Sequence, residues 1–189
     1  MNRLTPVPHS LLPHKGAVVW ITGLPGSGKS TLAFAVGAAL RESGMQTVVL
    51  DGDKLRDGLC ADLGFSVDDR IENMRRVAAV AKLFMMQGTV ALVALVSPIR
   101  SARARISDSL PEGDFIEIYC NSPLDVCKAR DPKGMYAMAE NGLIADFTGV
   151  SAAYEAPLAP ALTINTGSDS REACVQGLLA FLRPRLVVA

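Results

Sequence analysis

The chain has few of the residues that disulfide-bonded, zinc-binding or histidine-dependent proteins use. Its 189 residues include four cysteines and two histidines, and the cysteines form no C-x-x-C pair and have no histidine near them. This pattern favours buried free thiols over disulfides or a zinc site. His9 and His14 both fall in the proline-containing start of the chain. Catalysis by imidazole is therefore not expected.

Net charge and long apolar runs are lacking as well. Nineteen basic and nineteen acidic residues cancel, which gives no electrostatic case for a nucleic-acid or anionic-membrane partner. The longest aliphatic run, Val90 to Val96, is far shorter than the roughly 20 residues that cross a bilayer. Residues 1–16 lack the apolar centre of a signal peptide. We expect a flexible N-terminal arm over 1–16 and a cytoplasmic protein.

What the sequence does contain is an alternation of strand-like and helix-like segments. Apolar runs typical of β-strands occur at 17–22, 46–51, 89–96, 115–120 and 161–165. Helical patterns occupy about 29–43, 69–87, 100–108, 122–130, 135–141 and 170–183. Continuous apolar strands separated by helices indicate a parallel sheet with helices on both faces. We expect one α/β domain over residues 17–189 with a five-stranded parallel sheet.

The first expected strand leads into a phosphate-binding loop. Residues 23–30 read G-L-P-G-S-G-K-S and fit G-x-x-x-x-G-K-[ST] between a strand and a helix. Glycines let successive backbone N–H groups face phosphate oxygens, and the helix adds its positive end. Lys29 is expected to reach the β- and γ-phosphates, and Ser30 to bind Mg²⁺. The pattern predicts the P-loop NTPase fold, with a nucleoside triphosphate bound by Gly23, Leu24, Pro25, Gly26, Ser27, Gly28, Lys29, Ser30 and Thr31.

The second expected strand is the one that ends in carboxylates. Ligands in such folds gather at the carboxyl ends of the strands, and this strand ends in Asp51-Gly52-Asp53. The later strands end in polar residues without a carboxylate. Metal organisation and any general-base role therefore fall on Asp51 and Asp53. For Asp51, capping of the following helix is the alternative.

Further polar and aromatic residues follow at suggestive spacings. Arg56 lies three residues after Asp53, on the same side if a helix begins there. A turn presents Phe65, and Arg70 and Asn73 lie one helical turn apart just beyond it. On composition alone, Phe65 would more often be a core residue and Arg70 a solvated one.

A short basic cluster follows Ser97-Pro98, at the end of the third expected strand. It consists of Arg100, Arg103 and Arg105. A surface helix explains these arginines adequately. The alternative is a lid, because arginines near a triphosphate can close over it.

Several blocks of sequence together resemble the adenosine 5′-phosphosulfate (APS) kinase family. Besides the P-loop, they are D-G-D-x-x-R from residue 51, D-L-G-F-S-x-x-D-R-x-E-N from 62, R-D-P-K-G from 130 and F-T-G from 147. The match runs in order from about residue 16 to residue 166. Many families share the P-loop, whereas the other blocks together are specific.

The resemblance implies that the chain, with Mg²⁺, transfers the γ-phosphoryl group of ATP to the 3′-hydroxyl of APS. The product would be 3′-phosphoadenosine 5′-phosphosulfate, made in sulfate assimilation. Asp53 would lie at the acceptor hydroxyl and the metal, with Ser30 as a further metal ligand and Lys29 on the transferred group. The acceptor site implied by the resemblance comprises Asp53, Arg56, Phe65, Arg70, Asn73, Val96, Ser97, Lys133 and Phe147, with Phe65 and Phe147 on either side of the adenine.

Ser97 leaves two mechanisms open. The matching serine of some family members is associated with a phosphoserine, which would make it catalytic through a phosphoenzyme. Nothing nearby in sequence supplies the second base that such a route needs. We therefore expect direct in-line transfer, with Ser97 positioning the acceptor or simply ending its strand.

The family resemblance also carries expectations about partners and departures. Members are usually homodimers and work beside, or are fused to, an ATP sulfurylase. Departures that bear on lid closure, nucleotide affinity and turnover occur at Pro25, Lys54, Ala102, Ser107, Ala137, Met138, Glu140 and Ala145. Two rival functions are a nucleoside or sugar kinase and a non-catalytic module that binds the sulfated nucleotide. The acceptor-site set argues against the first, and intact Lys29, Ser30 and Asp53 argue against the second.

Overall fold

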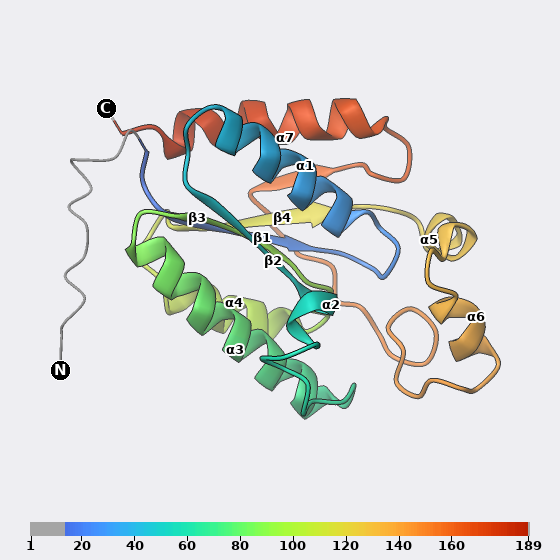
Figure 1. Cartoon of the computed structure of the whole chain (residues 1–189). Helices are drawn as coiled ribbons and strands as arrows, with labels where there is room; N and C mark the ends of the chain where they lie inside the picture. Colours follow the sequence, from blue (N-terminus) through green and yellow to red (C-terminus); the bar gives the residue numbers. More distant parts are fainter. Residues whose placement is uncertain (1–13, 189) are drawn as a thin grey trace, which may run out of the picture.

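The computed structural model describes residues 14–188 as a parallel sheet with helices on both faces (Figure 1). The strands are β1 (Ala17–Thr22), β2 (Thr47–Asp51), β3 (Val90–Ala94), β4 (Phe115–Cys120) and β5 (Leu162–Ile164). The helices are α1 (Lys29–Glu42), α2 (Gly52–Leu55), α3 (Val67–Met86), α4 (Arg100–Asp108), α5 (Leu124–Arg130), α6 (Met135–Glu140) and α7 (Arg171–Leu186). The expected five-stranded α/β fold is confirmed.

The order of the strands brings three loops together at one edge of the sheet. The order is β2-β3-β1-β4-β5, and every pair is parallel. In the central strand, Ile21 is in register with Ala94 of β3 and Ile118 of β4. The carboxyl ends of β1, β2 and β3 therefore meet. The P-loop follows β1 directly, Asp51 is the last residue of β2, and Ser97 lies shortly after β3.

Strand residues alternate between two hydrophobic cores because successive side chains point to opposite faces. Ala17, Val19 and Ile21 belong to the core shared with α1 and α7. Val18 and Trp20 belong to the core shared with α3 and α4. Burial on both sides explains why these strands read as unbroken apolar runs.

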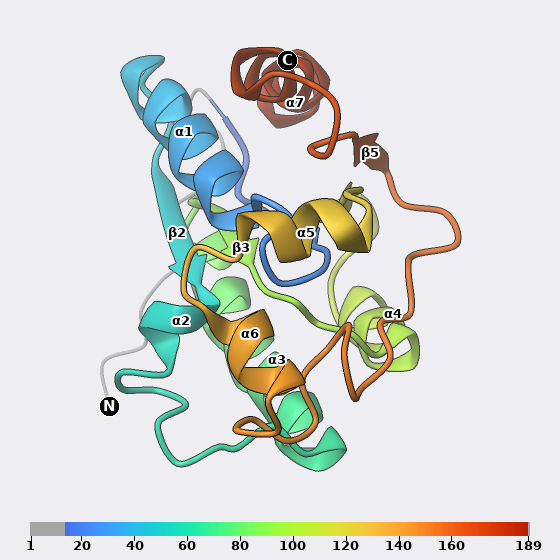
Figure 2. The same ribbon diagram turned by 90° about the vertical axis from the view of Figure 1, so that its right-hand side faces the viewer.

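A third, smaller cluster lies beyond the sheet in residues 131–156, which we call the capping segment. It contains α6, which lies beside α5 in Figure 2. Tyr136, Ala139 and Phe147 pack there with Cys127, and Leu24 of the P-loop packs against them. The capping segment thus has an apolar centre of its own and rests on the phosphate-binding loop.

The start of the domain differs from the expectation. His14 is buried, and its Nε2 accepts a 2.8 Å hydrogen bond from the backbone N–H of Gln46. The backbone N–H of Lys15 donates to the carbonyl of Leu186, and its ammonium pairs with Asp114 at 3.2 Å. The assignment of residues 14–16 to a flexible arm is therefore wrong, and residues 1–13 lie outside the described part.

Helix α7 also departs from its expected end near residue 183. It continues to Leu186 through Pro184, although proline cannot donate the helical hydrogen bond. Leu182 and Leu186 are fully buried on its inner face, and this packing outweighs the lost bond. Within residues 14–188 the four cysteines are free and buried, as expected. No helix in that range is long and apolar enough to cross a membrane.

Candidate active site

The P-loop adopts the backbone geometry that its glycines allow. Gly26 has φ 74°, and a Cβ there would lie 2.9 Å from the carbonyl oxygen of Cys127. Gly28 has φ 92° and directly precedes the first turn of α1. Because Gly28 has no side chain to cap that turn, the first N–H groups of α1 face the cavity as donors for an anion.

Lys29 is buried beside this loop. Its ammonium donates a 2.7 Å hydrogen bond to the carbonyl of Leu24 and lies 3.5 Å from Oγ of Ser27. Burial lowers the pKa of Lys29 to about 8, because desolvation disfavours the charged form. A bound phosphate would reverse that effect, since an adjacent negative charge favours the ammonium.

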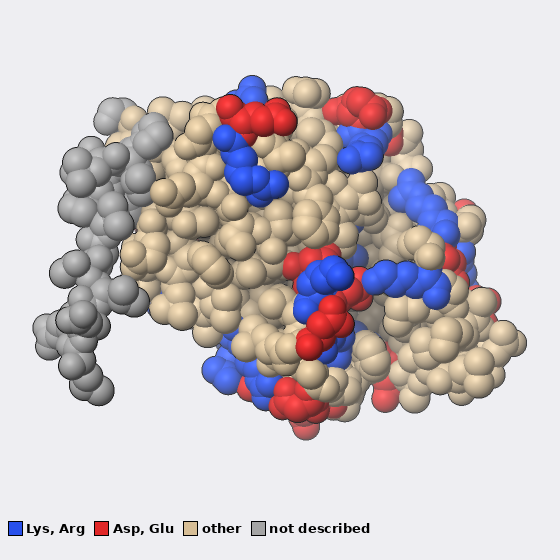
Figure 3. Space-filling model, in the orientation of Figure 1, with Lys and Arg blue, Asp and Glu red and all other residues tan. Residues whose placement is uncertain are grey.

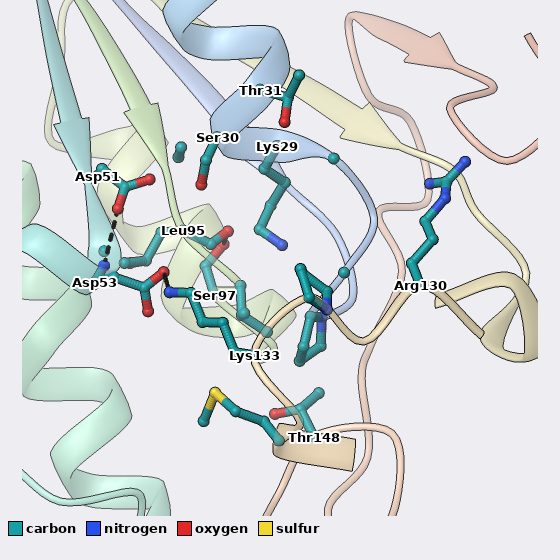
Figure 4. A pocket seen from close by; sticks show the side chains of 18 of the residues that line it. Lys29, Ser30, Thr31, Asp51, Asp53, Leu95, Ser97, Arg130, Lys133 and Thr148 are labelled. Carbon is teal, nitrogen blue, oxygen red and sulfur yellow. Dashed lines mark hydrogen bonds and ion pairs between the residues drawn. The ribbon is translucent and has the colours of Figure 1, made fainter. Parts of the chain in front are cut away.

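The two aspartates after β2 lie in different environments. Asp51 is buried, and its Oδ1 accepts from the backbone N–H groups of Asp53 (3.2 Å) and Lys54 (3.4 Å). The helix-capping alternative for Asp51 is therefore correct. Within the described residues its Oδ2 has no hydrogen-bond partner. Asp53 is exposed and forms an ion pair with Lys133 of the capping segment (Figure 4).

These donors fit a magnesium ion held partly by its substrate. Ser30, Asp51 and Asp53 all line the same cavity. No group of three or more His, Cys, Asp or Glu side chains within residues 14–188 could hold a metal alone. Mg²⁺ usually takes one or two carboxylates and completes its shell with phosphate oxygens and water. The orphaned Oδ2 of Asp51 suits that role, since a buried carboxylate oxygen without a partner is costly.

At the other end of the cavity lie an aromatic ring and two arginines. The ring of Phe65 is 37% exposed, with the guanidinium of Arg56 4.4 Å and that of Arg70 5.6 Å from its centroid. Arg56 also donates to the carbonyls of Leu63 and Gly64, and Arg70 to that of Phe65. The arginines thus hold the turn that presents Phe65, and Phe65 is not a core residue.

Two buried polar groups face this end of the cavity from opposite sides. Asn73 of α3 and Thr148 of the capping segment are 3% and 1% exposed. Within the described chain, neither Nδ2 of Asn73 nor Oγ1 of Thr148 has a hydrogen-bond partner. Buried polar groups are nearly always satisfied, so these two atoms mark places where a polar ligand would bind.

Phe147 lies in the small core of the capping segment. Its ring meets that of Tyr136 edge-on, with centroids 5.1 Å apart and planes at 85°. The hydroxyl of Tyr136 donates a 3.0 Å hydrogen bond to the carbonyl of Pro25 in the P-loop. Phe147 is 4% exposed and still lines the cavity, as Phe65 does.

Ser97 belongs to a buried hydrogen-bond network. Its Oγ accepts from Nε1 of Trp20 (3.0 Å) and donates to Oγ1 of Thr22 (2.9 Å). Thr22 donates to the carbonyl of Val96 at 2.8 Å. With its one hydrogen used there, Thr22 accepts from the hydroxyl of Tyr154 at 3.0 Å. The Ser97 hydroxyl thus both donates and accepts a hydrogen bond inside the protein, while its backbone has φ 40°.

One cavity of about 630 Å³ unites these parts. Its lining includes every expected acceptor-site residue, namely Asp53, Arg56, Phe65, Arg70, Asn73, Val96, Ser97, Lys133 and Phe147. Of the P-loop residues it includes Pro25, Gly26, Gly28, Lys29, Ser30 and Thr31. Gly23, Leu24 and Ser27 lie outside the lining of this cavity, and Ser27 is buried beneath it.

The lining also holds residues that the sequence did not single out. Beside the P-loop they are Arg130, Thr166, Asp169, Arg171 and Cys174, and opposite Asn73 they include Tyr136 and Thr148. Arg130 donates to the carbonyl of Thr166 at 2.7 Å. Arg130 and Thr148 stand inside the R-D-P-K-G and F-T-G blocks, which were a usable signal. The stretch from Thr166 to Cys174 carries no such pattern.

The interpretation of the basic cluster on α4 as three exposed or lid arginines is wrong for Arg103. Arg103 is 2% exposed and makes three internal hydrogen bonds, so it lies on the buried face of α4 and is not part of a lid. Ala102 is buried in the core against α3, and it does not occupy a lid position either. Arg105 is exposed, as a surface helix requires. On the face drawn in Figure 3, charges of both signs lie side by side near α2.

Comparison with known proteins connects this cavity to one enzyme family. The family described as adenylylsulphate kinase matches residues 15–165. An adenylyl-sulfate kinase of Acaryochloris marina is 51% identical over 93% of this chain and 85% of its own length. A probable adenylyl-sulfate kinase of Bacillus subtilis is 49% identical over 92% and 88%.

A solved structure shows the same similarity in three dimensions. It is the Mycobacterium tuberculosis APS kinase CysC in complex with AMPPNP and APS, with a TM-score of 0.85 at 43% identity. The similarity covers 90% of this chain and 99% of that one. Sequence blocks, fold and site geometry agree, and the chain belongs to the adenylylsulphate kinase family.

Proposed function

We propose that the protein transfers the γ-phosphoryl group of ATP to the 3′-hydroxyl of APS. The observation that carries this proposal is the single cavity that joins a P-loop to a second end lined by Phe65, Asn73 and Thr148. A related enzyme with the same fold holds AMPPNP and APS together. A cavity of this form allows the two nucleotides to meet between Lys29 and Asp53.

The donor end supplies positive charge in a fixed arrangement. The N–H groups at the start of α1 and the ammonium of Lys29 would bind the β- and γ-phosphates of ATP. Mg²⁺, held by Ser30 with Asp51 and Asp53, would neutralise the charge that develops during transfer. Because these groups are in place before reaction, they stabilise the transition state without reorganising.

At the acceptor end, the residues hold the second nucleotide and aim its hydroxyl. Phe65 and Phe147 would contact its adenine, and Asn73 and Thr148 would satisfy its polar groups. Arg56, Arg70 and Lys133 would attract the phosphosulfate. The carboxylate of Asp53 would orient the 3′-hydroxyl toward the γ-phosphorus and accept its proton. Transfer would then occur in one in-line step.

An assay with competing acceptors tests the proposal. With ATP and Mg²⁺, the protein should phosphorylate APS with a kcat/KM far above that for adenosine, AMP or gluconate. Equal or better phosphorylation of AMP or gluconate would show another small-molecule kinase. Tight binding of APS without turnover would show a non-catalytic module.

We propose a cytoplasmic homodimer that works beside an ATP sulfurylase in sulfate assimilation. Light scattering of the purified protein should give twice the mass of the 20.0 kDa chain. A monomer would overturn the assembly and leave the reaction untouched. A coupled assay would show whether added ATP sulfurylase supplies APS at a usable rate.

A further inference from the structure

Arg103 is a buried charge that the proposed reaction does not use. Its Nε donates to Oε1 of Glu117 on β4 (2.7 Å), one terminal nitrogen to the carbonyl of Ser97 (2.6 Å) and the other to the carbonyl of Glu155 (2.7 Å). Its guanidinium also lies 5.9 Å from the ring centroid of Tyr154. An arginine buried to this degree costs free energy unless it is paired and hydrogen-bonded.

The three acceptors lie on three separate parts of the molecule. Ser97 ends the turn after β3 that lines the cavity, Glu117 belongs to β4, and Glu155 lies at the end of the capping segment. Neighbouring contacts join the same parts, because the N–H of Glu155 donates to the carbonyl of Pro98 at 2.9 Å. Arg100 adds a backbone N–H bond to Oε2 of Glu155 at 2.8 Å.

We propose that Arg103 is a positioning residue for the acceptor site. It fixes the end of the capping segment against the Ser97 turn, and so sets the distance between the two walls of the cavity. Val96 and Ser97 line the cavity from the segment after β3, and Phe147 and Thr148, which precede Glu155 by eight and seven residues, line it from the capping segment. This inference rests on the proposed function, since it names the residue that aligns that site.

The geometry of the contacts requires arginine. A guanidinium presents five N–H donors in a planar fork, whereas a lysine ammonium is a point charge that cannot span three separated acceptors. None of the three acceptors belongs to the P-loop, so loss of Arg103 removes no direct contact with the donor end. Loss of Arg103 should therefore weaken binding of the acceptor more than binding of ATP.

The test compares Arg103→Met and Arg103→Lys with two controls on the same helix. Ile106→Ala removes buried packing in α4 without touching Ser97 or Glu155, and Arg105→Met removes an exposed arginine. Arg103→Met should raise the KM for APS and lower kcat/KM for APS roughly ten- to hundredfold, because a misplacement of about 1 Å can cost that much rate in an oriented site. Its KM for ATP should change little, and Arg103→Lys should recover part of the loss.

A purely structural role would give a different pattern. Ile106→Ala should lower Tm while keeping the ratio of the two KM values, and Arg105→Met should resemble the wild type. If Ile106→Ala raises the KM for APS as much as Arg103→Met at a similar Tm, the positioning role is wrong. Unchanged KM values for APS in both Arg103 variants would also overturn it. If Arg103→Met does not fold, Arg103→Lys and Glu117→Gln provide the same comparison.

Two readouts do not depend on turnover. Hydrogen exchange should accelerate in Arg103→Met at residues 147–156, whose Glu155 amide bonds to Pro98. The single tryptophan, Trp20, donates to Ser97, so its fluorescence should change as well. If exchange is faster in Arg103→Met but the wild type does not phosphorylate APS, the positioning role of Arg103 is supported and the proposed substrate is refuted. Unchanged exchange at residues 147–156 in a folded Arg103→Met variant would show that Arg103 does not hold the end of the capping segment.

Discussion

Replacing Ser97 by alanine separates two mechanisms for phosphoryl transfer. The hydroxyl of Ser97 accepts a hydrogen bond from Trp20 and donates one to Thr22. The change leaves the buried indole N–H of Trp20 without its partner, which costs about 1–3 kcal/mol of unfolding free energy. For a domain of this size that corresponds to a fall in Tm of about 2–4 °C per kcal/mol.

The expected effect on catalysis is smaller than the loss of a nucleophile. If Ser97 only positions the cavity wall, Ser97→Ala should lower kcat by about tenfold or less, equivalent to about 1.4 kcal/mol. Thr22→Val is the matched control, because it removes the acceptor of the Ser97 hydroxyl and keeps that hydroxyl in place. Both variants should lose similar stability and similar activity, and the fluorescence of Trp20 should shift in Ser97→Ala.

The stereochemistry of transfer gives an independent test of the same mechanism. ATP made chiral at the γ-phosphorus should yield product of inverted configuration, because a single in-line displacement inverts the centre. Two outcomes would refute this reasoning. One is retention of configuration, and the other is a collapse of kcat in Ser97→Ala while Thr22→Val stays active and both still bind APS.

Three further predictions follow from the site. Asp53→Asn should lower kcat by roughly 10²–10⁴, the range for a positioned acid–base group, whereas exposed Asp57→Asn should not; near-normal kcat in Asp53→Asn would remove that residue from the mechanism. Phe65→Ala should raise the KM for APS more than that for ATP, because a lost stacking partner costs about 1–3 kcal/mol of binding free energy. A lower Tm with both KM values unchanged would show that Phe65 has only a structural role. Because the pKa of Lys29 is lowered to about 8, and bound phosphate favours its charged form, ATP affinity measured by calorimetry should weaken as pH rises above about 8. Lys29→Arg, which stays charged, should lose that dependence, and the same slope in both proteins would contradict the assignment.

The parts of this protein that could be predicted from sequence are those encoded locally. Strands buried on both faces read as apolar runs, so the sheet could be predicted from the alternation of these runs with helical segments. The P-loop is specified by residues that are neighbours in the chain, and Asp51 and Asp53 follow a strand directly. In each of these features the informative signal lies within a few neighbouring residues, although the strands themselves pair with partners distant in sequence.

The parts that could not be predicted depend on partners distant in sequence. Arg103 binds Glu117, 14 residues away, and Glu155, 52 residues away. Helical spacing places Arg103 on the same face as Ile99 and Ile106, but its acceptors could not be identified from its own helix. His14 likewise binds the backbone of Gln46, 32 residues away, although its local sequence resembles a loose arm. Charge and proline content indicate whether a segment tends to be exposed and irregular, and tertiary hydrogen bonds can override that local tendency.

The structure also explains why departures from the family pattern need not alter the reaction. Ala137, Met138, Glu140 and Ala145 are exposed on the capping segment and do not line the described cavity. Glu140 pairs with Lys128 of α5 at 2.6 Å, which joins the two helices from outside. Among the departures, Pro25 does line the cavity, where it gives its carbonyl to Tyr136. Any residue could supply that carbonyl, so contact between the capping segment and the P-loop does not depend on the side chain at position 25. We therefore expect the departures to leave the choice of acceptor unchanged.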